Sequence, residues 1–139
     1  MDETGVAVHR VRLAAGREST VLHSHLSSSE WIYILKGTVT LVLARTLVSD
    51  PEEITPGPAD SIVYEETQLK QGDFAGFPAG PSAERWAHTL RAGNEDVEYL
   101  LGGDRPKLDV ITYPVRGQTL VYHGEHGAQS MFDGRCGEN

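Results

Sequence analysis

Short apolar runs alternate with turn-forming residues along this chain, and the pattern predicts strands rather than helices. Residues 6–13 (VAVHRVRL) and 62–69 (IVYEETQL) alternate in polarity, and residues 31–35 (WIYIL) are aromatic or β-branched. Successive side chains of a strand point to opposite faces, and such residues are enriched in strands. Further strands are expected at residues 20–25, 38–47, 74–77, 87–90, 97–101, 108–113 and 118–123.

Turn signals suggest how these strands are connected. Lys36-Gly37 predicts a tight turn that joins 31–35 to 38–47 as a hairpin. Residues 48–61 are rich in proline and acidic side chains, and we expect a surface loop there. Many short strands within about 110 residues are typical of a β-sandwich or a β-barrel. The sequence therefore predicts a single all-β domain.

Composition and charge narrow the class of protein. The 139 residues, 39% of them hydrophobic, suit one core, and the formal charge of −8 argues against nucleic acid and anionic membranes as partners. No apolar run approaches the roughly 18 residues of a membrane-spanning helix. The N-terminus carries acids where a signal peptide needs bases, and the one cysteine, Cys136, suits a reducing compartment. We expect a soluble cytoplasmic protein.

Two histidines one residue apart indicate a metal site. On a strand, His23 and His25 would share a face with their Cα atoms about 7 Å apart, so both imidazoles can reach one ion. Glu30 follows five residues later, and a turn between them would return its carboxylate to the same ion. Two histidines and a carboxylate suit Fe, Mn, Zn or Ni and leave coordination positions open. The alternative is a surface cluster held by hydrogen bonds.

The same residues carry a family resemblance. The pattern His23-x-His25-x4-Glu30-x6-Gly37 resembles the first motif of the cupin superfamily, and residues 72–80 (GDFAGFPAG) resemble the second. The histidine of the second motif is displaced to His88, behind what looks like a short insertion at residues 81–86. The likeness covers residues 6–114.

This resemblance implies a fold and a set of ligands. The fold would be the cupin double-stranded β-helix, a jelly-roll β-barrel, over residues 1–114. Residues 115–139 would be a C-terminal extension that packs on the barrel or trails from it. Cupin motifs place three histidines and one glutamate on a single divalent ion. Carried over to this chain, these ligands are His23, His25, Glu30 and His88.

Two further side chains are candidates for catalysis. Glu30 shares its strand face with Ile32 and Ile34, whereas Tyr33 takes the other face unless a bulge shifts the register. With such a shift, the Tyr33 phenol becomes a candidate acid, base or hydrogen-bond donor near the metal. Glu84 lies in the insertion beside His88, where a loop can contact substrate. The alternative for Glu84 is a solvated side chain.

Several other residues are expected to have structural or solvent-facing roles. Phe77 and Tyr99 are expected to be core aromatics rather than substrate contacts. His9 is expected to face solvent. The pair His123 and His126 has a metal-like spacing, but the neighbouring glycines favour a turn.

A metal in such a barrel predicts an enzyme acting on a small, oxygen-rich organic substrate. The residues leave three chemistries open: Fe-type dioxygenation, metal-assisted isomerisation and lyase chemistry. Two other hypotheses are a non-catalytic module that binds a small ligand or metal, and a vestigial site. Because β-sandwiches leave edge strands exposed, and small cupins are commonly dimers, we also expect a homodimer with residues 6–13 at its interface.

Overall fold

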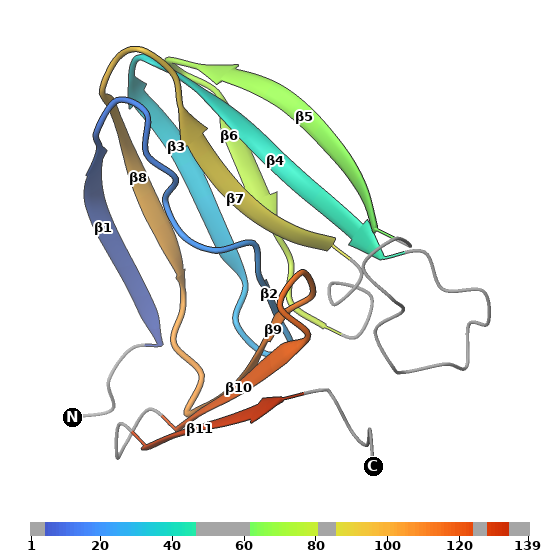
Figure 1. The fold of residues 1–139 in the computed structure, drawn as a ribbon. Coiled ribbons are helices and arrows are strands. Elements are labelled where there is room, and N and C mark those ends of the chain that lie inside the picture. The colour runs from blue at the N-terminus through green and yellow to red at the C-terminus, as the bar shows by residue number, and fades with distance from the viewer. Residues whose placement is uncertain (1–4, 47–61, 81–85, 124–127, 134–139) are drawn as a thin grey trace.

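The computed structural model describes residues 5–46, 62–80, 86–123 and 128–133, and its regular elements there are all β-strands (Figure 1). No helix in these ranges could cross a membrane. The expected loop at 48–61 lies outside the described residues. The strands are β1 (Val6–Leu13), β2 (Ser24–His25), β3 (Glu30–Lys36), β4 (Thr38–Thr46), β5 (Ile62–Lys70), β6 (Phe74–Phe77), β7 (Trp86–Ala92), β8 (Val97–Asp104), β9 (Leu108–Tyr113), β10 (Gln118–His123) and β11 (Ala128–Asp133).

These strands form three antiparallel sheets. One has the order β1-β8-β3-β6, a second β5-β4-β7 and a third β11-β10-β9-β2. The first two sheets pack against each other, and the third crosses one end of the pair (Figure 1). The all-β expectation is confirmed.

The hydrophobic core lies between the first two sheets. Ile34 and Val97 from one sheet are completely buried, and Val39 from the other is 1% exposed. Strand β3 buries Ile32 and Ile34, whereas Tyr33 between them is 38% exposed. This alternation is the period-two pattern seen in the sequence, and it fixes which side chains face inward.

The expected hairpin across Lys36-Gly37 is wrong. Strand β3 pairs with β6 and β8, whereas β4 pairs with β5 and β7, so the chain passes from one sheet to the other at Gly37. Gly37 has a φ of +88°, and a Cβ there would lie 2.9 Å from the carbonyl oxygen of Asp96. Glycine is needed at this corner because any other residue would be strained at this positive φ and its Cβ would clash with the Asp96 carbonyl oxygen.

The segment that carries the first two histidines is less regular than expected. Only Ser24–His25 of the expected strand 20–25 forms a named element, β2, which pairs with β9. Upstream of it, Ser19 N–H donates to the carbonyl oxygen of Leu90 at 2.8 Å, and His23 forms an isolated bridge with His88. These contacts hold the segment between β7 and β9.

Two strands after residue 114 continue the third sheet. Strand β10, expected from the sequence, pairs with β9, and β11 pairs with β10. The sequence pattern did not predict β11.

The outer face of the sheet β1-β8-β3-β6 carries large apolar side chains. Val6, Val8 and Phe74 are 66%, 55% and 62% exposed. The Trp31 indole on this face stacks with the Phe74 ring, with 6.1 Å between ring centroids. It also covers Gly102, where an added Cβ would lie 2.1 Å from Trp31 Cζ2.

Candidate metal centre

Three imidazoles converge on one carboxylate oxygen. The Nε2 atoms of His88, His25 and His23 lie 3.1, 3.4 and 3.8 Å from Glu30 Oε2. His88 and the segment ending in β2 come from one side of the centre, and Glu30 comes from the start of β3. The cluster therefore joins residues that are up to 65 positions apart, between His23 and His88.

Backbone pairing sets the positions of these side chains. The N–H of His88 donates to the carbonyl oxygen of His23 at 2.9 Å, which brings the two residues side by side. Glu30 pairs with Phe77 on β6 and with Gly103 on β8. A Cβ at Gly103 would lie 2.4 Å from the carbonyl oxygen of Ser29, so this close approach beside Glu30 requires glycine.

Hydrogen bonds orient two of the rings. His25 Nδ1–H donates to Asp109 Oδ2 at 2.6 Å, and His23 Nδ1–H donates to the carbonyl oxygen of Val21 at 2.8 Å. Both acceptors lack hydrogen, so in each neutral ring the proton is on Nδ1 and the lone pair is on Nε2. The two Nε2 lone pairs are thus available at the centre.

The centre is buried, and its ionisable groups shift one another's pKa values. Burial, the largest influence on the Glu30 carboxyl, acts to raise its pKa, but the three imidazoles outweigh burial and hold the pKa well below its usual range. Burial likewise acts to lower the pKa of His25, but Glu30 and Asp109 together raise it above its ordinary value. At His88, burial prevails over Glu30 and lowers the pKa.

The donor set fits a divalent metal ion. Ligand atoms of His23, His25 and Glu30 all lie within 4.8 Å of one another. His25 Nε2 is buried and has no hydrogen-bond partner, although its distance to Glu30 Oε2 is short. A buried nitrogen lone pair without a partner is unfavourable unless another group binds it. Neutral imidazole nitrogens beside a carboxylate are the ligands that Fe, Mn, Zn and Ni accept.

Three other residues that the sequence singled out, Tyr33, His9 and His123, are exposed. Tyr33 is on the outer face of β3, away from the cluster, because the one register irregularity in this strand falls between Ile34 and Lys36, after the tyrosine. Glu84 lies outside the described residues. His9 is exposed, as expected. His123 is exposed too, and residue 126 lies outside the described part of the chain.

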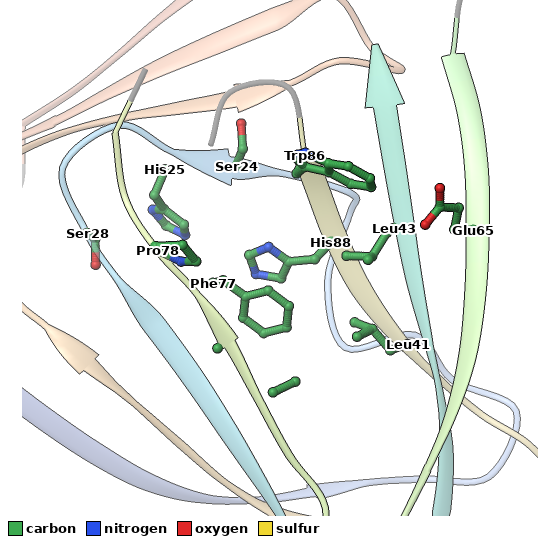
Figure 2. Close-up of a pocket in the computed structure, with 12 residues that line it drawn as sticks. Ser24, His25, Ser28, Leu41, Leu43, Glu65, Phe77, Pro78, Trp86 and His88 are labelled. Atoms are coloured by element: carbon green, nitrogen blue, oxygen red, sulfur yellow. The ribbon is translucent and has the colours of Figure 1, made fainter. Parts of the chain in front are cut away.

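A cavity of about 520 Å³ opens beside the cluster (Figure 2). Its lining includes His25 and His88 at the metal end, and Leu41, Leu43 and Trp86 beyond them. Phe77 packs against the hydrophobic core, as expected, and it also lines the cavity. Its ring stacks on His88 with centroids 3.8 Å apart and planes 7° apart. Tyr99 is 3% exposed in the core, as expected.

Sequence reasoning missed Asp109 and the apolar wall. Asp109 is 4% exposed on β9 and binds His25 across 84 positions of sequence. An acidic residue inside the apolar run 108–113 (LDVITY) is the signal that could have identified it, since a buried carboxylate needs partners. No sequence feature indicates that Leu41 and Leu43 face the cavity rather than only the core.

The fold and site together define a β-sandwich protein with a histidine-rich centre between its sheets. No protein-family model matches the chain, and no curated protein matches its sequence. Solved structures do match. A protein from Acidithiobacillus ferrooxidans, provisionally named a sugar phosphate isomerase, is 25% identical with a TM-score of 0.70, over 93% of this chain and 67% of its own.

Two other solved structures extend this likeness. A sugar phosphate isomerase of the cupin superfamily from Silicibacter pomeroyi is 19% identical with a TM-score of 0.70, over 95% of this chain and 69% of its own. A cupin protein from Bacteroides fragilis is 20% identical with a TM-score of 0.50, over 74% and 68%. The chain has the cupin fold.

Proposed function

We propose that this protein is a metal-dependent enzyme whose divalent ion is held by His23, His25, Glu30 and His88. The convergence of three imidazole Nε2 atoms on one oxygen of Glu30, within 3.1–3.8 Å, carries the proposal. The unpaired lone pair of His25 supports it. Four protein ligands on a six-coordinate ion leave two positions for oxygen atoms of a substrate.

Among the chemistries open to such a site, we favour isomerisation over oxygenation or lyase chemistry. The two solved structures with the highest TM-scores cited above carry the name sugar phosphate isomerase. A divalent ion supplies a Lewis acid that polarises a substrate carbonyl. The protein's own part is to hold the four ligands, to bind the substrate in the adjoining cavity and to move a proton.

Proton transfer needs a side chain that is not a metal ligand. Glu65 on β5 lines the cavity and carries a carboxylate, so we assign it as one candidate proton acceptor. Glu84 remains the second candidate from the sequence. Tyr33 has no role in this proposal, because its side chain is on the outer face of β3.

Elemental analysis of the protein purified without chelators tests the ligand set. We expect about one Fe, Zn, Mn or Ni per chain, and we expect His25→Ala to lose it. His9→Ala is the matched control, because His9 is an exposed histidine of the same chain. Absence of metal after reconstitution, or metal retained by His25→Ala, would refute the assignment.

Activity assays on the metal-loaded protein test the reaction class. Isomerisation of hydroxy-carbonyl compounds would support the proposal, and oxygen consumption would move the function to the dioxygenase alternative. Stoichiometric metal with neither activity would favour a module that binds a small ligand without turnover.

A further inference from the structure

The walls of the cavity differ from its metal end. In Figure 2, His25 and Ser28 lie on one side, Leu41 and Leu43 lie on the other side below Trp86, and His88 lies between the two groups. A substrate bound to the metal through oxygen atoms must extend along these apolar side chains. The cavity thus presents a polar end and an apolar wall to the same molecule.

The apolar wall, formed by Leu41 and Leu43 on β4 and Phe77 on β6, is firmly packed. Leu41 is 7% exposed on β4, and Leu43 packs against the same hydrophobic core. Phe77 on β6 stacks on His88, which holds its ring against the cavity. Burying apolar substrate surface here releases water from both partners, which stabilises the complex by about 25 cal/mol per Å².

Charges around the cavity disfavour a phosphate group. Among the described lining residues, Glu65 carries the one acidic side chain and none is a lysine or an arginine. Arg45, which pairs with Trp86 between β4 and β7, does not line the cavity. Its guanidinium is 5.3 Å from the centroid of the Trp86 ring. Beyond the histidines and serines of the metal end, a phosphate dianion would meet apolar surface and the Glu65 carboxylate, and the chain as a whole has a formal charge of −8.

We propose that the substrate has two unlike ends: an oxygen-bearing head that reaches the metal centre, and an uncharged apolar body, alkyl or aromatic, that lies against Leu41, Leu43 and Phe77. This inference rests on the proposed function, since the metal centre fixes the head. The proposed substrate differs from the sugar phosphates that appear in the names of two structural neighbours.

Ligand binding is measured by fluorescence of Trp86, which lines the cavity. The chain has two tryptophans, so Trp31→Phe isolates the signal. The Zn-loaded protein is titrated with straight-chain 2-oxo acids from three to eight carbons, which share one chelating head. We expect Kd to fall about fourfold per added methylene until the wall is covered.

Two comparisons make the result specific to this wall. In Leu43→Ser the dependence on chain length should flatten, whereas in Leu100→Ser, a leucine on the outer face of β8, it should persist. Circular dichroism of both variants verifies folding. Ribose and ribose 5-phosphate form the second pair, and we expect the phosphate to bring no gain in affinity.

Each outcome bears on one proposal. A Kd independent of chain length, an unchanged trend in folded Leu43→Ser, or tighter binding of ribose 5-phosphate than of ribose would overturn the two-ended substrate. In all three cases the zinc content of the same samples is measured, so that the metal centre can stand while this inference fails. Loss of zinc would instead refute the proposed function.

Discussion

Asp109 offers the sharpest test of how this centre is organised. Both of its carboxylate oxygens act as acceptors: Oδ2 binds the Nδ1–H of His25 at 2.6 Å, and Oδ1 binds the backbone N–H groups of Ser27 and Val110 at 2.9 Å each. The side chain is 6% exposed, so water does not readily replace these bonds. Asp109→Asn keeps the shape of the side chain and removes one acceptor.

The consequence for metal binding follows from the hydrogen-bond inventory. If the amide oxygen of Asp109→Asn stays with the backbone, its NH2 group faces His25 Nδ1 and donates to it. The His25 ring then carries its proton on Nε2, the atom that the metal needs. Losing such an oriented partner costs about 10–100-fold in metal affinity, and an unpaired buried donor costs about 1–3 kcal/mol of folding free energy.

The assay is competition between the protein and a chelator for Zn²⁺, together with ¹⁵N NMR of the imidazole nitrogens. Asp104→Asn is the matched control. Asp109 accepts the backbone N–H of Ser27, and Asp104 Oδ1 likewise accepts the backbone N–H of Ser29, at 2.6 Å. We expect normal affinity in Asp104→Asn, and weakened binding with Nε2 protonated in metal-free Asp109→Asn. Wild-type affinity in Asp109→Asn, with His25 still protonated on Nδ1, would refute the reasoning.

Three further predictions concern pH, assembly and packing. The pKa of His25 is raised above its ordinary value of 6.5, so protonation of His25 begins to compete with metal binding at a pH above 6.5. Metal affinity should therefore fall on acidification by about tenfold per pH unit for each proton displaced. The apolar outer face predicts a dimer in sedimentation experiments, and Val8→Asp should make it monomeric. Gly102→Ala should lower the free energy of unfolding by about 1–3 kcal/mol, measured by urea denaturation, because Trp31 occupies the space of the new Cβ.

Each of these predictions has a contrary result. Metal affinity that stays constant from pH 8 to pH 5 would contradict a histidine-rich centre. A wild-type monomer would contradict the dimer. Gly93→Ala is the packing control, because no atom lies within 4 Å of its added Cβ, and an equal loss of stability in both variants would contradict the role of Trp31.

The sequence alone determined the all-β class and most strand positions, and it pointed to the four side chains that the structure brings together, His23, His25, Glu30 and His88. Period-two alternation is a local property, so Ile32 and Ile34 could be assigned to the buried face of β3 and Tyr33 to the other. The spacing of His23 and His25 indicates a shared site because side chains two residues apart lie on the same face of a strand. The cupin resemblance added His88, which the structure brings to 3.1 Å from Glu30.

Tertiary structure decided what depends on contacts between distant segments. The local sequence at Gly37 predicts a hairpin turn, but Gly37 forms a corner between two sheets, because β3 pairs with β6 and β8 whereas β4 pairs with β5 and β7. Asp109 meets His25 only because β9 pairs with β2, and Phe77 reaches the cavity only because β6 pairs with β3. Local pattern gives each side chain a face, whereas the register and order of the strands decide which faces meet.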